Sequence, residues 1–317
     1  MPNQTPESFS FTTTNFKFKN QQNLYHGKVR DVYDIGEQLI IIATDRISAF
    51  DCILPRPIPY KGQVLNQISA YFLNNAIDIC KVWLESTPDV NVSVGKKCSP
   101  ISIEFVVRGY LAGHAAREYN SGKRILCGVR LEDGLVEGEK LPEPIITPTT
   151  KAHEGHDMDI SYQDIIELNL IDPEILDEIY KTSIELFNRG TTLAEDKGLI
   201  LVDTKYEFGL YQGKICLMDE IHTPDSSRYY IKEGYNERQS QGLPQIQLSK
   251  EFVREWLTHH GFSGKPDEIM PEMPEAFVWE ISNRYIELFE KITSTKFIKS
   301  EDTSILKRIK NNLQSYF

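Results

Sequence analysis

Residues 199–208, LILVDTKYEF, alternate between apolar and polar side chains and therefore predict a β-strand. Successive side chains of a strand point to opposite faces of its sheet. One face of this strand is expected to be apolar, with Ile200, Val202, Tyr206 and Phe208. The other face is expected to be charged, with Asp203, Lys205 and Glu207. The pattern thus predicts a strand that covers a core on one side and carries charge on the other.

The residues that follow predict the return of this strand. Residues 209–213 contain two glycines suited to a turn, and residues 214–220 have the pattern of a second strand. With the turn near 212–213, Glu207 comes roughly opposite 217–219, and Asp219 falls on the charged face. Carboxylates that face each other across strands repel, which favours a cation between them, and Mg²⁺ carrying phosphates suits such oxygens. The alternative is a solvated strand face.

The rest of the pattern predicts a mixture of strands and helices. Further strands are expected at 25–34, 38–44 and 102–107. Helices are expected at 62–82, 115–120, 164–167, 173–197, 250–259, 274–292 and in the tail 296–317. The residues up to 22 predict an extended or partly disordered lead-in, and those from Arg228 to about Leu248 predict a loop.

A long irregular stretch is expected at 128–160, where Gly, Pro, Thr and His cluster. Structureless segments of this length inside a compact protein are usually functional, so a lid or binding loop is predicted. His153 and His156 lie three residues apart. Without a third ligand nearby, this spacing is poor evidence for a zinc site.

Two basic segments are suited to anions. The hairpin expected from 25–34 and 38–44 presents Gly27, Lys28 and Arg30, which together could cover the phosphates of a nucleotide. Arg108 lies beside glycines at a strand-to-helix junction, where an anion would sit near a helix N-terminus. The alternatives are an exposed edge strand in the first case and a surface arginine in a tight turn in the second.

Composition narrows the class of protein. A chain of 317 residues, 40% hydrophobic and 26% charged, is ordinary for a globular protein of two lobes or one large α/β body. The formal net charge of −11 argues against a nucleic-acid surface but allows local basic clusters for small anionic substrates. Five cysteines without metal spacing, a polar N-terminus and the lack of a membrane-length apolar run predict a soluble cytoplasmic protein.

Phosphoryl transfer is the chemistry that these groups favour, because carboxylates can hold Mg²⁺ while Lys and Arg hold phosphates. Arg228 ends a turn, TPDSSR, that also offers Asp225 and Ser227 to a ligand. The sequence contains no Walker A motif, no GxGxxG, no kinase HRD triplet and no GxSxG. A covalent intermediate on the protein is therefore not indicated.

Six segments together resemble the SAICAR synthetase family of purine biosynthesis. They occur in the family's order between about residue 20 and residue 290, and only their combination is specific. The segments are GKVRDVYD (27–34), ATDRISAFD (43–51), EFVVRGYLAGHAAREY (104–119), PEPIITPTTKAHEGHD (142–157), VDTKYEFG (202–209) and MDEIHTPDSSRY (218–229).

The resemblance implies an ATP-dependent ligase that joins L-aspartate to the carboxylate of carboxyaminoimidazole ribotide (CAIR). The products would be SAICAR, ADP and phosphate, formed through an acyl phosphate. It implies an α+β fold in which a smaller N-terminal antiparallel-sheet lobe, 1–110, packs over a larger ATP-grasp- or kinase-like lobe, 111–317, with C-terminal helices. The implied partners are ATP, CAIR and L-aspartate, without nucleic acid or membrane, in a monomer or homodimer.

The resemblance also implies roles for single residues. Gly27, Lys28, Arg30, Glu104 and Lys151 would bind ATP, and Glu207 and Asp219 would hold Mg²⁺. CAIR would be bound by Arg108, His114, Asp225, Ser227 and Arg228. Lys205 and Asp203 would be the catalytic pair. L-Aspartate would be bound by Asp45, Ser48 and Asp51.

Two positions depart from the family's pattern. Many members have Ser where this chain has His114, whose charge depends on pH. The segment near 239–251 replaces an expected Asp-Lys-Gln run, so no ligand role is assigned to it. The alternatives are another ATP-dependent phosphotransferase, such as an inositol-phosphate kinase, or a nucleotide-binding scaffold with a degenerate site. A kinase would need no L-aspartate to form ADP, and a scaffold would bind ATP without turnover.

Overall fold

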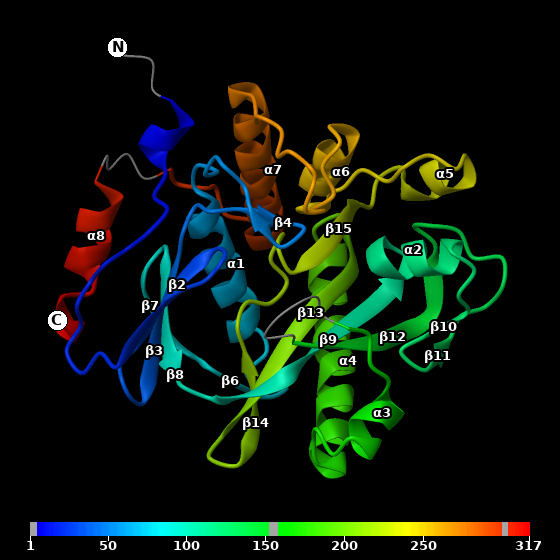
Figure 1. The fold of residues 1–317 in the computed structure, drawn as a ribbon, viewed down its shortest axis with the longest axis horizontal. Coiled ribbons are helices and arrows are strands. Elements are labelled where there is room, and N and C mark those ends of the chain that lie inside the picture. The colour runs from blue at the N-terminus through cyan, green and yellow to red at the C-terminus, as the bar shows by residue number, and fades with distance from the viewer. Residues whose placement is uncertain (1–4, 152–157, 300–303) are drawn as a thin grey trace.

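Two mainly antiparallel sheets lie side by side in the computed structural model, which describes residues 5–151, 158–299 and 304–317 (Figure 1). The first has the strand order β1-β2-β3-β8-β7. Its strands are β1 (Asn23–His26), β2 (Arg30–Asp34), β3 (Gln38–Ala43), β7 (Leu84–Asp89) and β8 (Val92–Lys96). Helix α8 (Ile305–Asn312) packs beside β7 at the outer side of this sheet.

The second sheet has the order β12-β9-β13-β14-β6, and a further strand, β15, also pairs with β13. Only the β14–β6 pair is parallel among the pairs of the described chain. The strands of this second sheet are β6 (Lys81–Val82), β9 (Ser99–Tyr110), β12 (Lys140–Thr150), β13 (Leu199–Tyr211), β14 (Lys214–Met218) and β15 (Ser227–Ile231). Two small hairpins complete the strands, β4 (Ser48–Ala49) with β5 (Cys52–Ile53) and β10 (Ile125–Leu126) with β11 (Val129–Arg130).

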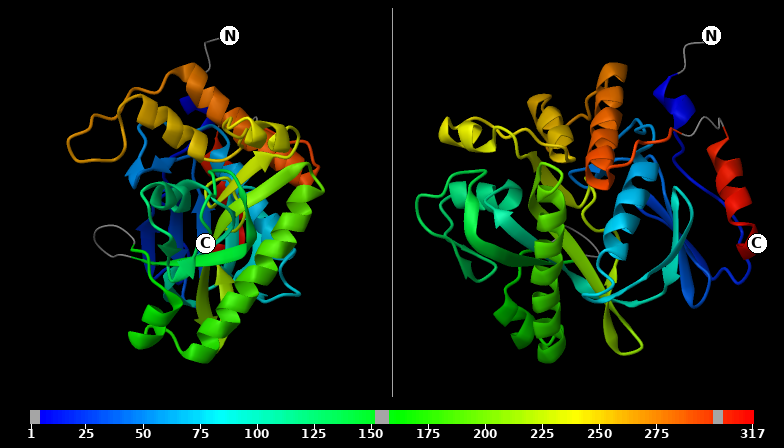
Figure 2. Two further views of the ribbon diagram at one scale, coloured as in Figure 1. Left: turned by 90° about the vertical axis from the view of Figure 1, so that its right-hand side faces the viewer. Right: turned by 180° about the vertical axis from the view of Figure 1, so that it is seen from behind.

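Helices cover the back of both sheets and the top of the molecule (Figure 2). Helix α4 (Pro173–Glu195) packs on β13 and β9, and α1 (Lys61–Asn74) packs between β3 and α7 (Glu275–Thr293). The remaining helices are α2 (Gly113–Asn120), α3 (Tyr162–Glu167), α5 (Tyr235–Ser240) and α6 (Glu251–His259). The α+β, two-lobed class expected from the sequence is confirmed. None of the helices in the described ranges is long and apolar enough to cross a membrane.

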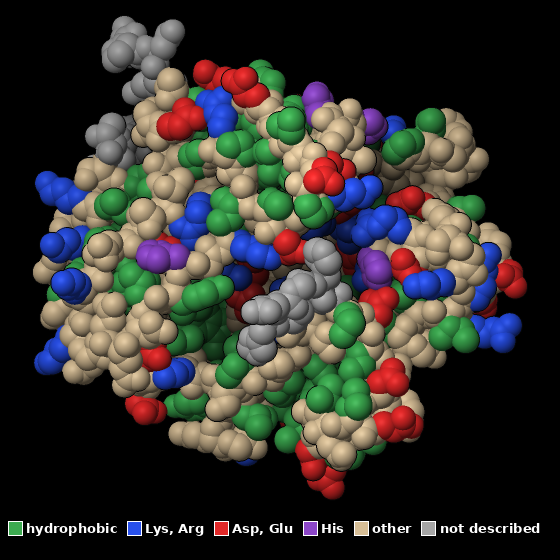
Figure 3. Space-filling view, in the orientation of Figure 1, with side chains coloured by type: hydrophobic (Ala, Val, Ile, Leu, Met, Phe, Trp, Pro, Cys, Tyr) green, Lys and Arg blue, Asp and Glu red, His purple; other side chains and the backbone are tan. Residues whose placement is uncertain are grey.

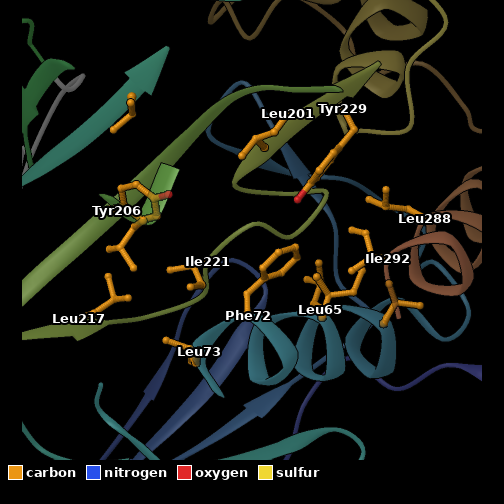
Figure 4. Packing of buried hydrophobic residues seen from close by; sticks show 14 of the residues in the cluster. Leu65, Phe72, Leu73, Leu201, Tyr206, Leu217, Ile221, Tyr229, Leu288 and Ile292 are labelled. Atoms are coloured by element: carbon orange, nitrogen blue, oxygen red, sulfur yellow. The ribbon is translucent and has the colours of Figure 1, made fainter. Parts of the chain in front are cut away.

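The main core joins the six-stranded sheet to α1, α4 and α7. Figure 4 shows Phe72 and Leu65 of α1 pointing toward Leu288 and Ile292 of α7 on one side and toward Ile221 on the other. Ile221 belongs to the segment after β14, so this segment passes through the core rather than over the surface. The core thereby fixes the backbone on either side of the charged residues that follow β14.

A β-bulge changes the face of β13. Leu201 of β13 pairs with Tyr229 of β15, and Asp203 pairs with Arg228. The chain therefore advances two residues along β13 while it advances one along β15, which is a β-bulge. The extra residue, Val202, reverses the alternation of the strand. The prediction that Ile200, Val202, Tyr206 and Phe208 share one face is therefore wrong. Tyr206 and Phe208 lie in the main core, whereas Ile200 and Val202 lie in a separate cluster with Tyr110, Ala112 and Tyr230.

Several other predicted boundaries also change. The strand predicted at 25–34 is two strands, β1 and β2, joined by a turn at 27–29. The helix predicted at 62–82 ends at Asn74, and the helix in the tail is limited to α8 and a 3₁₀ turn, Gln314–Tyr316. The lead-in is extended within its described part, but Phe11 and Phe18 anchor it in a second core under α8.

The two segments predicted to be loops contain regular structure. Strand β12 occupies Lys140–Thr150, and β15 and α5 lie between Arg228 and Leu248. The division of the chain at residue 110 stays a prediction. On either side of that boundary, β9 and β13 are neighbours in one sheet.

Candidate functional site

Two cavities open between the sheets, and their linings differ in character. The first, of about 510 Å³, combines an apolar part with a charged end. Its apolar part is formed by Val29, Val32, Leu39, Ile41, Trp83, Cys98 and Met218. The second, of about 490 Å³, is lined mainly by polar and charged side chains, including Arg108, Arg117, Arg228 and Arg254. A flat apolar group suits the first cavity, and an anion suits the second.

The cavities share a wall. We call this set the shared wall, and its members are Lys28, Ser48, Lys205, Asp225, Ser226 and Lys250. Figure 3 shows acidic and basic side chains gathered around a hollow across the middle of the face presented in Figure 1. Because the shared wall belongs to both linings, ligands in the two cavities would meet beside it.

The floor of the site is a lysine between two carboxylates. Glu104 of β9 and Glu207 of β13 are directly opposed across the strands. Lys205 Nζ lies 2.8 Å from Glu104 Oε1 and 2.6 Å from Glu207 Oε1, and Lys151 also forms an ion pair with Glu207. Asp203, Lys205 and Glu207 share the charged face, as the alternation predicts. The cation between the opposed carboxylates in this structure is a lysine.

Burial and ion pairing set the protonation of the floor. Burial alone would raise the pKa of Glu207, but the ammonium groups of Lys205 and Lys151 hold that pKa far below its usual value. Burial would likewise lower the pKa of Lys205, but the carboxylates of Glu207 and Glu104 raise it. Burial raises the pKa of Glu104 despite the nearby lysines. Lys205 and Glu207 are therefore both charged at neutral pH.

The segment after β14 supplies the next acidic groups. Arg30 of β2 forms a two-pronged ion pair with Asp219, in which the Nη2–Oδ2 distance is 3.0 Å, and Arg30 Nη2 lies 3.7 Å from Glu220 Oε1. The hairpin turn at 212–213 pairs Glu207 with Met218, which confirms the predicted range 217–219. Because directly paired residues share a face, strand alternation places Met218 on the face of Glu207, and the prediction that alternation places Asp219 there is wrong. Asp219 lines the first cavity together with Glu207, but its carboxylate contacts Arg30.

His222 holds this segment to the core. Its side chain is 2% exposed, its Nε2 is 2.9 Å from the Tyr206 hydroxyl, and its carbonyl accepts a hydrogen bond from Tyr229. A Cβ on Gly190 of α4 would lie 2.4 Å from His222 Cε1, so this packing requires a glycine there. Asp219 and His222 have left-handed φ values of 59° and 57°, which non-glycine residues rarely adopt. Tight packing therefore maintains a strained path beside the first cavity.

We expect His222→Gln to make the protein less sensitive to mild acid. Burial lowers the pKa of His222 to about 3, so the imidazole is neutral when folded but gains a proton below about pH 6.5 when unfolded. Its contribution is complete above pH 6.5 and is lost as the pH falls toward 3. Between pH 7.5 and 5.5 the wild type should lose about 1.4 kcal/mol more stability than the variant. Urea unfolding of both proteins at the two pH values measures this difference. Equal losses would contradict it.

Two arginines flank Asp203 in the second cavity. Arg108 Nη1 and Arg228 Nη1 lie 3.1 Å and 2.6 Å from Asp203 Oδ2, and Arg228 also pairs with Glu251 at 2.7 Å. At Gly113, which has φ of +57°, a Cβ would lie 2.2 Å from Arg228 Nη2. The RGYLAG turn thus needs its second glycine to admit Arg228. Arg254 also pairs with Glu251, so three guanidinium groups face the two carboxylates of Asp203 and Glu251, which leaves positive charge for an anion.

The other residues predicted to bind CAIR lie around this pair. His114, at the start of α2, has its Nε2 2.9 Å from Asp159 Oδ2, and Ser227 shares a hydrogen bond of 2.7 Å with Thr204. Asp225 is in the shared wall. The second cavity therefore brings together all five residues predicted for CAIR. The candidate zinc residues His153 and His156 lie outside the described residues.

The three residues predicted to bind L-aspartate separate in space. Ser48 and Asp51 line the second cavity, and Lys28 forms an ion pair with Asp51. Asp45 lines neither cavity, and its carboxylate accepts hydrogen bonds from the backbone of Phe11 and Gly62. Burial raises the pKa of Asp45 to about 7. Asp45 therefore joins the lead-in to α1, and this geometry gives no support to its predicted contact with L-aspartate.

Sequence reasoning missed several residues of the site. Lys250 and Glu251 line the second cavity, although they belong to the segment to which the pattern assigned no role. Arg254 follows one helical turn later and pairs with Glu251. Lys250 and Arg254 are four positions apart, so they lie on the same side of the start of α6. This spacing is the signal in the sequence that could have predicted an anionic ligand at this end of the helix.

Comparison with known proteins identifies the family. The sequence model of the SAICAR synthetase family matches residues 23–269. Phosphoribosylaminoimidazole-succinocarboxamide synthase of Bacteroides thetaiotaomicron is 56% identical, with 97% of this chain and 98% of that protein aligned. The corresponding synthase of Cytophaga hutchinsonii is 55% identical, with 95% and 97% aligned.

Solved structures agree with the sequence relatives. SAICAR synthase of Saccharomyces cerevisiae in complex with SAICAR superposes with a TM-score of 0.76 at 28% identity, covering 90% of this chain and 99% of that one. A SAICAR synthetase in complex with ADP superposes with a TM-score of 0.66 at 25% identity, covering 87% and 100%. From its sequence, its fold and the paired cavities with their shared wall, this chain belongs to the SAICAR synthetase family.

Proposed function

We propose that this protein joins L-aspartate to the carboxylate of CAIR with the hydrolysis of ATP, giving SAICAR, ADP and phosphate in purine biosynthesis. The observation that carries the proposal is the shared wall, because a nucleotide and a ribotide in neighbouring cavities can exchange a phosphoryl group only where the cavities meet. Relatives solved with SAICAR and with ADP support this pair of ligands. A cytoplasmic location and a monomeric or homodimeric state stay predictions.

ATP fits the first cavity. Its adenine would lie against apolar residues of β2 and β3, such as Val32 and Ile41, and its phosphates would point toward the charged end. There the turn at Gly27 and Lys28, with Arg30 behind it, would cover them. Lys151 adds a further cation beside Glu207. Four of the residues predicted to bind ATP, namely Gly27, Lys28, Arg30 and Lys151, line this cavity. Glu104 lines the second cavity instead and would support Lys205 from the neighbouring strand.

CAIR fits the second cavity. Its phosphate would be held by Arg108 and Arg228, whose guanidinium groups suit two-pronged contacts with phosphate oxygens. Ser227 and His114 would complete this subsite, and Asp225 would reach the ribose or imidazole. The carboxylate to be activated would then point to the shared wall. Ser48 and Asp51, at the same opening, are the remaining candidates for contacts with L-aspartate.

Lys205 would lie between the two reacting groups. Because it lines both cavities and is charged, its ammonium can hold the transferred phosphoryl group and the CAIR carboxylate close together. The carboxylate oxygen would attack the γ-phosphorus of ATP, the bond from that phosphorus to the β-phosphate oxygen would break, and ADP would leave, giving an acyl phosphate. The amine of L-aspartate would then attack the carbonyl carbon and release phosphate. Asp203 would orient Arg108 and Arg228 through their shared contacts.

Magnesium fits the chemistry of the first cavity. Glu207 and Asp219 both line it and offer the carboxylate oxygens that Mg²⁺ prefers. Within the described ranges no three His, Cys, Asp or Glu side chains are placed to hold a metal by themselves, which suits an ion bound partly through substrate phosphates. Glu207 and Asp219 would hold it, and it would neutralise phosphate charge. Lys205, Lys151 and Arg30, their present partners, would then turn to the phosphates.

We expect Glu207→Gln and Asp219→Asn to lower turnover by at least about 100-fold and to raise the Mg²⁺ concentration for half-maximal rate. Each change removes an anionic oxygen but preserves the size of the side chain. A Mg²⁺ titration at fixed ATP, CAIR and L-aspartate measures both quantities. Glu220→Gln is a matched control, because Glu220 lines the same cavity but is not assigned to the metal. An unchanged Mg²⁺ requirement in both variants would contradict the metal assignment.

The proposed function is tested by following ADP and SAICAR with purified protein, ATP, Mg²⁺ and CAIR. ADP formation coupled to SAICAR is expected only when L-aspartate is added, and other amino acids should not replace it. Continuous ADP formation without L-aspartate would favour a kinase instead. Nucleotide binding without turnover would favour a degenerate scaffold.

A further inference from the structure

Lys250 lies where the two cavities meet and has no role in the steps described so far. It immediately precedes α6 and lines both cavities, and its side chain is 12% exposed. In the proposed function, the amine of L-aspartate must reach the activated carboxylate at this same wall. Lys250 is therefore within the region in which the new C–N bond forms.

The neighbouring carboxylate does not fully balance the charge of Lys250. Asp225 Oδ2 accepts from Lys61 at 2.9 Å and Asp225 Oδ1 accepts from Tyr285 at 2.6 Å, whereas Lys250 Nζ lies 3.6 Å from Oδ2. Lys61 comes from α1 and Tyr285 from α7, and the side chains of both are buried. The nearest carboxylate is thus already held by two closer partners, and Lys250 is the third and most distant.

The other charged groups around Lys250 reinforce this imbalance. Arg254 and Lys61 repel an ammonium there, while Glu220 and Asp225 attract it. Glu251 is held between Arg228 and Arg254, so its charge is already neutralised. Burial, followed by these repulsions, lowers the pKa of Lys250 to about 8. By contrast, the pKa of Lys205 is raised, so Lys205 and Lys250 of the shared wall have pKa values shifted in opposite directions.

Ligation requires a proton acceptor at this position. The amine that attacks an acyl phosphate must be uncharged, and it still carries a proton to lose once the C–N bond forms. Lys205 and Asp225 are poor acceptors, because Lys205 keeps its proton and both carboxylate oxygens of Asp225 already accept hydrogen bonds, from Lys61 and Tyr285. An amine in its neutral form can accept a proton and return it to solvent afterwards.

We propose that Lys250 accepts the proton that the α-amine of L-aspartate loses as it attacks the acyl phosphate. The C–N bond forms, the bond between the carbonyl carbon and the phosphate oxygen breaks, and phosphate leaves with the electron pair. The proton of the attacking nitrogen goes to Lys250 Nζ. This inference rests on the proposed function, whose own test is the L-aspartate-dependent formation of SAICAR by the wild type.

Comparing the rates with two nucleophiles, L-aspartate and hydroxylamine, distinguishes proton acceptance by Lys250 from the formation of the acyl phosphate. Hydroxylamine traps an acyl phosphate as a hydroxamate. It is a much weaker base than an α-amine, so it is uncharged at neutral pH, and the protonated nitrogen formed by its attack is acidic enough to lose its proton to water without the same acceptor. For Lys250→Arg, which keeps a cation but resists deprotonation, we expect kcat with L-aspartate to fall about 100- to 10,000-fold. CAIR-dependent hydroxamate formation should stay within about threefold of the wild type. Arg254→Lys is a control that changes a neighbouring cation of the same cavity.

The outcomes decide between the hypotheses. A wild type that makes no SAICAR would overturn the proposed function. With an active wild type, Lys250→Arg that keeps its rate with L-aspartate, or that loses both reactions equally, would overturn the role of Lys250. If this variant does not fold, the wild-type pH profiles decide. With saturating L-aspartate, kcat should fall below about pH 8, whereas the rate with hydroxylamine should not, and coincident profiles would overturn the proposal.

Discussion

Lys205→Met will lower kcat about 100- to 1,000-fold, the size of effect seen when one group that stabilises developing charge is removed. Lys205 lines both cavities, and its ammonium contacts both opposed carboxylates of the floor. Without it, Glu104 and Glu207 face each other across the strands with Lys151 as the remaining cation. The phosphoryl group would meet a negative surface. ADP and SAICAR formation under saturating substrates measures the loss.

A matched control tests whether the effect depends on where the lysine lies and not only on the loss of one positive charge. Lys97→Met removes a half-exposed lysine that pairs with Asp34 and lines neither cavity, so its kcat should match the wild type within about twofold. Lys205→Arg retains the charge but not the compact ammonium, and we expect it to recover only part of the activity. A Lys205→Met enzyme with wild-type kcat would show that Lys205 serves the sheet and not the reaction.

The charged floor could be predicted because it depends on one local rule. In a strand, residues at i, i+2 and i+4 share a face, and this rule placed Asp203, Lys205 and Glu207 together without knowledge of any partner. The turn at 212–213 then fixed the register with Met218. The same rule failed for Ile200 and Val202, because a bulge depends on the pairing with β15, which lies more than twenty residues later.

Strand β12 was missed for a different physical reason. Its residues KLPEPIITPTT contain three prolines, which predict a loop because proline cannot donate a backbone hydrogen bond. β12 is the end strand of its sheet, next to β9, and its other side pairs only at the Thr149–Asp159 bridge within the described residues. An edge strand tolerates proline, since the missing donors can face away from the ladder. Edge position is a property of the assembled sheet and cannot be recognised from the strand's own residues.

Lys61 and Lys250 could not be predicted because their environment is assembled from distant segments. Asp225 comes from the segment after β14, Lys61 from α1 and Tyr285 from α7. In the sequence each lysine looks like an ordinary solvated charge. The role of each lysine depends on how deeply its ammonium group is buried and on which carboxylate it contacts. Both are set by how α1, α6 and α7 pack together.

Lys61→Met will destabilise the protein by about 3–5 kcal/mol, because it leaves the buried carboxylate of Asp225 without its closest cation. The side chains of Lys61 and Asp225 are 0% and 3% exposed, so water cannot replace the lost partner. Lys61→Met with Asp225→Leu removes both charges and should recover part of the loss. Lys291→Met breaks an exposed pair with Glu287 on α7 and should cost under about 0.5 kcal/mol.

Urea unfolding of the four proteins measures these differences, and the pattern matters more than any single value. If Lys61 and Asp225 stabilise each other by their contact in a buried site, the single change at Lys61 must cost more stability than the double change, although the double change alters two residues. The opposite order would mean that Lys250, 3.6 Å from Asp225, moves in to neutralise the carboxylate. In that case Lys250 would gain a full counter-charge, its pKa would rise, and Lys61→Met should also lose activity with L-aspartate near neutral pH.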